Sequence, residues 1–216
     1  RLALDDGMQV LAATGPVGRI PQLAVHLDRG VNAEGLKLDP QRHLDAIWGV
    51  DTADPIIEAV GGRNVVAVVC THGHNDHITV APELSEKLDA RLFVHPGDQM
   101  LWEETHGGLA HEDLSDGDLF QIAGTDLTVL HTPGHAPGAC CLHAPELGAL
   151  FSGDTLFQGG PGATGRSYSD FPTIVESIRE KLLTLPSDTV VHTGHGDDTT
   201  IGAEAPHVQE WLDRGH

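Results

Sequence analysis

Residues 65–77, VVAVVCTHGHNDH, join an apolar run to a group of potential metal ligands. The first part, residues 65–70, has the length and the β-branched composition of a buried strand. The second part, residues 71–77, contains three histidines and one aspartate. Because rigid scaffolds present functional groups where a strand ends in a loop, this cluster predicts a site rather than a packing surface.

The spacing within this cluster suggests two directions of coordination. His72 and His74 are two positions apart, so their rings can point the same way if the backbone stays extended. Asp76 and His77 come after a turn and can face a second point. We therefore expect one loop to supply ligands to more than one place.

Three later loops each place one coordinating side chain after a predicted strand and beside a glycine, which lets the backbone approach closely. They are TPGH at 132–135 with His135, SGDT at 152–155 with Asp154, and TGHG at 193–196 with His195. With the first cluster they make five histidines and two aspartates, enough for two metal ions and one bridging carboxylate. Purely structural roles for all seven are disfavoured, because buried polar groups without partners are rarely tolerated.

The ligand chemistry points to zinc. Imidazole and carboxylate ligands without a thiolate suit two Zn²⁺ ions per chain, and iron or manganese is possible. Two such ions can share a hydroxide, because coordination lowers the pKa of water from about 15.7 to about 7. We expect a nucleophile at neutral pH.

Composition excludes several partner classes. The chain has 12 basic and 32 acidic residues and a net charge of −20, which argues against nucleic acid and anionic membranes. No apolar stretch is long enough to span a bilayer, and we see no signal peptide. Cys70, Cys140 and Cys141 make no disulfide framework, so we expect a cytoplasmic protein with buried thiols. A homo-oligomer remains possible.

The pattern changes near residue 50. Residues 1–50 form an atypical N-terminal segment, in which an Asp-Gly pair predicts a hairpin within residues 2–13. Residues 19–44 resemble a segment of the aspartyl aminopeptidase family that belongs to its dimerisation part, but none of that family's metal motifs is present. Residues 51–216 read as regular α/β. We expect helices over 53–60, 80–88, 98–105, 171–185 and 205–214, and strands over 65–70, 91–95, 119–123, 127–131, 139–143, 150–152 and 189–193.

THGHNDH (71–77), TPGH (132–135), SGDTLF (152–157) and TGHG (193–196) together resemble the signature of the metallo-β-lactamase superfamily, and Asp51 resembles its first motif. The resemblance implies an α/β fold, an αββα sandwich with the site at one edge between the sheets. The N-terminal segment either supplies strands of the first sheet or leaves that sheet altered. The resemblance further implies the metal ligands: His72, His74 and His135 for the first zinc, Asp76, His77 and His195 for the second, and Asp154 as the bridge.

Within the superfamily, PGHAPG, GDTLF and GHGDDTTIGAE resemble the glyoxalase II-like thioester hydrolases. This implies a binuclear hydrolase of a small thioester or ester, with catalytic roles for Asp76 and His195. Where those enzymes usually have a compact Gly-Cys-Gly-Arg segment, this chain has GGPGATGRSYSDFP. The acyl and thiol groups of the substrate and the roles of Arg166 and Tyr168 are therefore open.

Two other functions fit parts of the same pattern. A mononuclear iron persulfide dioxygenase shares motifs of the type of His72, His74, His135 and Asp154. A metal-binding protein without turnover would result if the N-terminal segment disrupts the first sheet. A lactonase or β-lactamase activity has less support.

Overall fold

The computed structural model describes residues 60, 62–122 and 124–215, together with the backbone of four short strands nearer the N-terminus. The chain divides into two units, residues 1–59 and 60–216. In the first unit β1 (Leu2–Ala3) pairs antiparallel with β2 (Gln9–Val10), as the hairpin prediction requires, and β3 (Gly18–Arg19) pairs with β4 (Ile47–Trp48). Asp51 and the helix predicted over 53–60 lie outside the described residues, except for residue 60.

The smaller sheet of the second unit has three parallel strands, in the order β5 (Ala67–Val69), β6 (Arg91–Val94) and β7 (Glu112–Asp113). α4 (Ala81–Leu88), the turn η1 (Pro96–Asp98) and α5 (Gln99–His106) connect these strands. Their shared core is apolar: Cys70, Ile78, Ala81, Leu92, Val94 and Trp102. β5 is shorter than the predicted strand, because its partner β6 begins at Arg91, which pairs with Ala67.

The larger sheet has six strands, in the order β15 (Thr199–Thr200), β14 (Val190–Thr193), β11 (Ala149–Gly153), β10 (Cys140–Ala144), β9 (Thr125–His131) and β8 (Leu119–Ile122). β11 and β14 are parallel, and the other neighbours are antiparallel. Because β9 and β11 both run opposite to β10, β9, β11 and β14 share one direction. Their carboxyl ends therefore lie at the same edge of the sheet.

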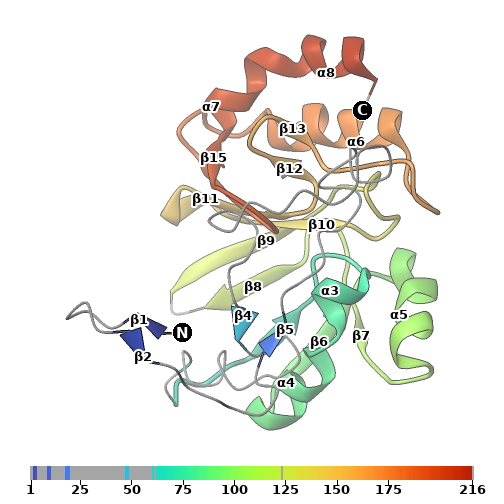
Figure 1. Cartoon of the computed structure of the whole chain (residues 1–216), viewed down its shortest axis with the longest axis vertical. Coiled ribbons are helices and arrows are strands. Elements are labelled where there is room, and N and C mark those ends of the chain that lie inside the picture. Colours follow the sequence, from blue (N-terminus) through green and yellow to red (C-terminus); the bar gives the residue numbers. More distant parts are fainter. Residues whose placement is uncertain are drawn as a thin grey trace. The chain divides into compact units, whose positions relative to one another are not determined.

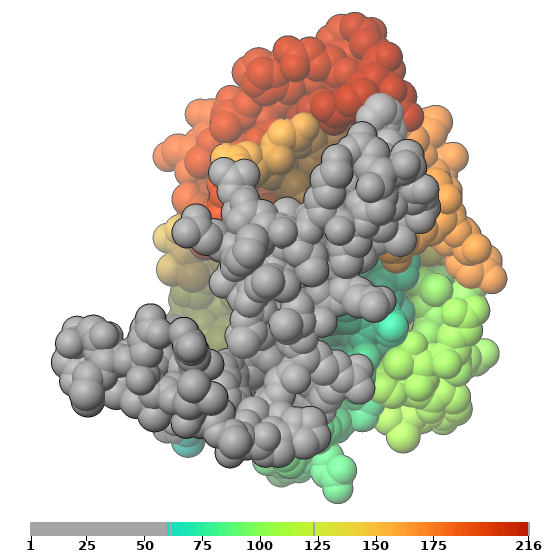
Figure 2. Space-filling model, viewed as in Figure 1, coloured from blue at the N-terminus to red at the C-terminus, as the bar shows by residue number. Residues whose placement is uncertain are grey.

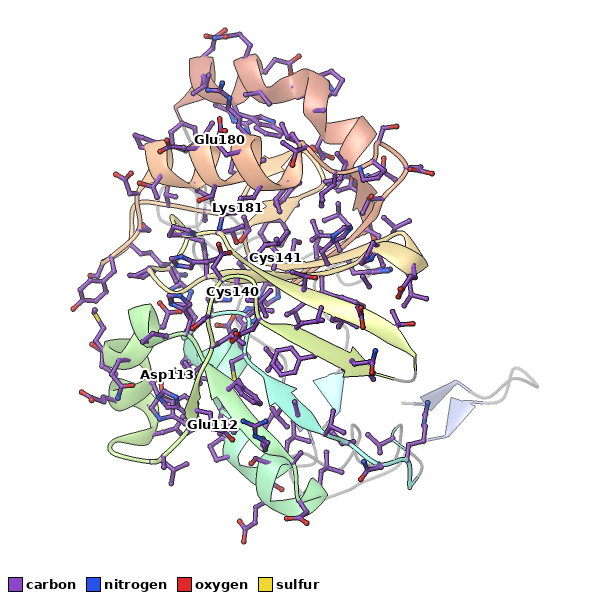
Figure 3. All side chains as sticks on the ribbon, turned by 180° about the vertical axis from the view of Figure 1, so that it is seen from behind. Glu112, Asp113, Cys140, Cys141, Glu180 and Lys181 are labelled. Carbon is purple, nitrogen blue, oxygen red and sulfur yellow. The ribbon has the colours of Figure 1, made fainter. Side chains whose placement is uncertain are left out.

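The two sheets pack face to face through an apolar layer. Phe93 and Leu114 on the side of the smaller sheet meet Val129 and Cys140 of the larger one. Side chains alternate along a strand, so the adjacent Cys141 instead joins the core beneath the C-terminal helices (Figure 3). Within this unit the layers run helices, sheet, sheet, helices, which confirms the predicted αββα sandwich (Figure 1).

The outer helices of the larger sheet correct two predictions. The helix expected over 171–185 is α6 (Phe171–Ser177) followed by a π-helical turn, η3 (Ile178–Leu182), and its apolar side still faces the core. The helix expected over 205–214 is a 3-10 turn, η4 (Ala205–His207), followed by α8 (Val208–Arg214), and an unpredicted short helix, α7 (Ile201–Glu204), precedes them. Pro206 supplies no N–H for a continuous helix, so the helix restarts after it.

Short elements that were not predicted complete the unit. They are η2 (Pro145–Leu147) between β10 and β11, and the paired strands β12 (Leu156–Phe157) and β13 (Gly160–Pro161). In Figure 2 the C-terminal helices and the helices of the smaller layer lie at opposite ends of the visible face. Among the described residues, none of the helices combines the length and the hydrophobicity needed to cross a bilayer.

The cysteines and two tryptophans are packing residues, as expected. All three thiols are free and buried, and burial raises the pKa of Cys70 to about 12 and that of Cys141 to about 11. They therefore carry no thiolate at neutral pH. Trp102 and Trp211 are buried in the two helix-facing cores, while the side chain of Trp48 lies outside the described residues.

Candidate metal centre

The four predicted ligand loops meet at one edge of the sandwich. The loop 71–77 follows β5 of the smaller sheet, and the other three follow β9, β11 and β14 of the larger one. The N–H of Cys140 in β10 donates to Thr71 O at 2.7 Å and joins the first loop to the larger sheet, and the N–H of Gly194 donates to Gly153 O at 2.8 Å and joins the last two loops. The packing of the two sheets therefore brings all seven predicted ligands into one region.

The first ligand cluster consists of His72, His74 and His135, whose ligand nitrogens all lie within 4.8 Å of one another. His135 Nε2 is 3.0 Å from His74 Nδ1. His72 Nε2 is buried and has no hydrogen-bond partner among the described residues. Two nitrogens on one tetrahedral zinc lie about 3.3 Å apart, since each Zn–N bond is about 2.0–2.1 Å. The cluster therefore fits a single ion.

A backbone carbonyl sets the orientation of His135. Its Nδ1 lies 2.8 Å from Ala163 O. Because a carbonyl oxygen only accepts, Nδ1 carries the proton and donates. Nε2 is then unprotonated and faces the cluster, which is the usual arrangement of a metal-binding histidine.

The second ligand cluster consists of Asp76, His77 and His195. Asp76 and His77 lie on a short helix, α3 (Asn75–Ile78), rather than in a simple turn. His77 Nε2 is 3.0 Å from His195 Nε2, and His195 Nε2 is 3.4 Å from Asp76 Oδ2. Asp76 and His195 are 49% and 38% exposed, against 13% for His77. The second cluster therefore forms the open side of the site.

Asp154 connects the two clusters. Its Oδ1 lies 3.4 Å from His77 Nε2, and its Oδ2 lies 3.5 Å from His135 Nε2 and 3.7 Å from His195 Nε2. Oδ1 is buried without a hydrogen-bond partner among the described residues. A Cβ at Gly194 would lie 2.2 Å from this oxygen, so only glycine leaves room for the carboxylate. One side chain is thus in reach of both ligand clusters.

Burial favours the neutral form of His72, His77 and His135 by lowering their pKa. Burial is the main cause that lowers the pKa of His77 and of His135 to about 4 in each case. Burial raises the pKa of Asp154 to about 6, which leaves a carboxylate at pH 7. The hydrogen bond between Asp76 and His195 lowers the pKa of the acid and raises that of the imidazole. Metal binding needs deprotonated ligands, and burial favours that state in the histidines.

The segment 163–170 places Arg166 beside the first cluster. Ser169 Oγ accepts from the N–H groups of Gly165 and Arg166 and shapes the turn. Burial is the main cause of the lowered pKa of His135, and the charge of Arg166 adds to it. Tyr168 is exposed and has a φ of 70°. Both Arg166 and Tyr168 are exposed to solvent.

The sequence reasoning did not single out Asp98. Its carboxylate contacts the backbone of two ligand loops and is fully buried. It follows the buried strand β6 through a Pro-Gly turn, the same position after a strand as the predicted ligands. A carboxylate shortly after a buried strand is therefore the sequence feature that could have identified Asp98 as a site residue.

Comparison with known proteins decides the family. The sequence model of the Metallo-beta-lactamase superfamily matches residues 41–195. This chain belongs to the metallo-β-lactamase superfamily. Most of the segment that resembles an aminopeptidase, residues 19–44, precedes the match. With its His/Asp clusters, the superfamily member is a metallo-hydrolase.

Named relatives agree with this assignment. The hydroxyacylglutathione hydrolase GloC of Haemophilus influenzae is 34% identical over 190 residues, covering 76% of this chain and 90% of the relative. The probable metallo-hydrolase YqgX of Bacillus subtilis is 37% identical over 157 residues, covering 66% and 74%.

Solved structures show the same fold. The B3 metallo-β-lactamase BLEG-1 superposes with a TM-score of 0.63 at 30% identity, over 72% of this chain and 82% of that one. TTHA1623, solved in a di-iron-bound form, has a TM-score of 0.62 at 32% identity, over 70% and 81%.

Proposed function

We propose that this superfamily member binds two zinc ions and hydrolyses a small thioester or ester. The observation that carries the proposal is the pair of ligand clusters joined by the carboxylate of Asp154. A site for a single ion would use the ligands of only one of the two clusters. The di-iron form of TTHA1623 supports two ions in this fold and keeps iron as the alternative metal.

The chain's own residues account for both ion positions. His72, His74 and His135 would hold the first ion, Asp76, His77 and His195 would hold the second, and Asp154 lies within reach of both clusters. When bound, such ions supply a nucleophile at neutral pH, because coordination lowers the pKa of water to about 7. The buried side of the site, formed by His72 and Asp154, keeps bulk water away from the reacting atoms.

We assign catalytic roles to Asp76 and His195, which lie at the open side. Asp76 Oδ2 can accept a hydrogen bond from the attacking water and orient it, and His195 Nε2 lies 3.4 Å from the same oxygen, so both side chains face the same position. A thiol leaving group has a pKa of about 8.5, so it departs as a thiolate without a proton donor. A site without a dedicated acid therefore suits thioesters better than amides.

The substrate class follows from charge and from one relative. The chain carries a net charge of −20, so an anionic substrate needs a local cation to approach. Arg166 supplies a positive charge beside the first cluster. The name of GloC specifies hydroxyacylglutathione, an anionic thioester. We propose a hydroxyacyl thioester of glutathione, or of a similar anionic thiol, as the substrate of a cytoplasmic enzyme.

The test combines metal analysis with a substrate panel. Purified protein is assayed for zinc, iron and manganese, and then for hydrolysis of lactoylglutathione, an acyl-coenzyme A, a lactone and a β-lactam. We expect about two zinc ions per chain and fastest turnover of the glutathione thioester. One iron per chain, with oxygen uptake in the presence of glutathione persulfide, would instead establish the dioxygenase. A mononuclear dioxygenase would not require the second cluster, so we rank this alternative function lower.

A further inference from the structure

Asp98 links the two loops that carry the first ligand cluster. Its Oδ2 accepts the N–H of Gly73 at 2.6 Å, and its Oδ1 accepts the N–H of Gly138 at 2.6 Å. Gly73 separates His72 from His74, and Gly138 lies shortly after His135. One carboxylate therefore holds a loop of the smaller sheet and a loop of the larger sheet.

The side chain of Asp98 is tightly packed against both Gly73 and Gly138. A Cβ at Gly73 would lie 2.8 Å from Asp98 Cβ, and a Cβ at Gly138 would lie 2.7 Å from Asp98 Cγ. The side chain of Asp98 is 0% exposed. Both loops are therefore packed against the carboxylate itself, and a displacement of Asp98 would move both.

The turn that carries Asp98 is itself held in place. His95 Nδ1 accepts the N–H of Gly97 at 3.1 Å, and the His95 ring stacks on His131 with ring centres 4.0 Å apart. His131 Nε2 lies 2.8 Å from Pro137 O, in the loop that follows His135. These contacts fix the turn against the His135 loop independently of Asp98.

We propose that Asp98 is a positioning residue that sets the metal affinity of the His72–His74–His135 cluster. It accomplishes this by fixing the backbones of the two ligand loops relative to each other. The second cluster depends on it less, because His195 follows β14 and because Asp76 and His77 are held by α3, which begins two residues after Gly73. The inference rests on the proposed binding of two zinc ions.

The test is the substitution Asp98→Asn, which keeps the shape. Each carboxylate oxygen accepts one N–H, so the amide places a donor against one of the two backbone donors. Zinc affinity is measured by chelator competition, and the first equivalent of Co²⁺ is followed by its visible absorption. We expect one of the two zinc equivalents to bind about 10- to 100-fold more weakly, with a changed Co²⁺ spectrum. The other equivalent should keep its affinity within a factor of about 3.

Glu204→Gln is the matched control. Glu204 is also a buried carboxylate, and both of its oxygens accept the N–H of Gly159, at 3.1 and 3.0 Å, away from the ligand loops. This variant should melt at a lower temperature but bind both zinc equivalents as the parent does. An Asp98→Asn protein with both affinities unchanged, or a Glu204→Gln protein that weakens the same equivalent equally, would overturn the proposal.

Three outcomes distinguish failure of the role of Asp98 from failure of the proposed function. If Asp98→Asn does not fold, Asp98→Ala is titrated in the same way, and failure of both to fold would reject a positioning role in favour of a purely structural one. If the parent protein does not bind two zinc ions, the proposed function fails. If the parent binds two and Asp98→Asn binds them equally well, only the role of Asp98 fails.

Discussion

The Nε2 atoms of His77 and His195 lie 3.0 Å apart, although 118 positions separate the two residues in the chain. Their rings are nearly perpendicular, with an interplanar angle of 86°. One residue belongs to the helix after β5 and the other to the loop after β14, so neither sheet alone could form the contact. The second cluster can therefore form only when both halves of the sandwich are correctly assembled.

Removal of the His195 side chain should prevent metal binding at the second cluster. We expect His195→Ala to bind about one zinc ion rather than two and to lose about 100-fold in kcat/KM, or ~2.7 kcal/mol of transition-state stabilisation. Elemental analysis and thioester kinetics would show both effects. His207→Ala is the control, since His207 is a surface histidine that pairs with Glu210. Parent-like metal content in His195→Ala would remove this residue from the ligand set.

Metal removal should lower thermal stability. An ion that binds only the folded state stabilises it by about 4.1 kcal/mol at a free concentration 1,000 times Kd. A unit of this size gains about 2–4 °C per kcal/mol. We therefore expect a chelator to lower Tm by about 10 °C and added zinc to restore it, as followed by calorimetry. An unchanged Tm would mean that the clusters hold no ion.

The metal-free protein should lose stability in acid. The pKa of His77 and of His135 is about 4 in the folded chain and 6.5 ordinarily. Between these values the unfolded chain binds more protons, so the contribution of both histidines is present above pH 6.5 and lost as the pH falls through 4. Burial likewise lowers the pKa of His72.

The raised pKa of Asp154 changes the folding stability in the opposite direction over part of this pH range. Its pKa rises from 3.8 to about 6, so its contribution is present below pH 3.8 and lost as the pH rises through 6. His195, whose pKa is raised by Asp76, also acts in this opposite direction. Three histidines with a lowered pKa outweigh these two groups, so we expect Tm of the chelator-treated protein to fall between pH 7 and pH 5. Melting curves at intervals across this range measure it. A Tm that rises on acidification would show that the histidines are not buried as neutral groups.

Gly194→Ala should damage the bridge. The added Cβ would lie 2.2 Å from Asp154 Oδ1 and 3.1 Å from Gly153 O, so the carboxylate or the loop must move. We expect a loss of activity of about 100-fold, ~2.7 kcal/mol, with reduced metal content. Gly108→Ala is the control, because nothing lies within 4 Å of its Cβ and its φ is not positive. Equal activity of the two variants would show that the bridge tolerates displacement.

Arg166 should determine affinity for anionic substrates. We expect Arg166→Gln to raise KM for a glutathione thioester about 10-fold, ~1.4 kcal/mol, while its effect on a neutral ester and on metal content is small. Arg179→Gln is the control, since Arg179 is an exposed cation on η3. Equal loss with neutral and anionic substrates would assign Arg166 to the loop's structure rather than to recognition.

Regular elements and ligand loops could be predicted because their signals are local. Apolar runs of strand length mark the strands β6 and β9, and a coordinating residue follows each strand that leads to the site. The regular α/β pattern followed from these elements, and the αββα sandwich was implied by the resemblance of the motifs to the metallo-β-lactamase superfamily. The pairing of β12 with β13, and the edge strands β7 and β15, were missed because two-residue strands have no periodicity and depend on their neighbours.

The kinds of ligand, their position after strands, and hence the class of chemistry were fixed by residues that are close together in the sequence. The resemblance implied how the ligands are grouped, but the clusters themselves depend on contacts such as His74 with His135 and His77 with His195, which form only when the two sheets pack face to face. The role of Asp98 likewise depends on the tertiary structure, because Gly73 and Gly138 become its hydrogen-bond partners only when the two sheets pack together. Separations of a few ångströms between distant residues are set by core packing, because a close-packed interior fixes the sheets to within less than a side chain's width.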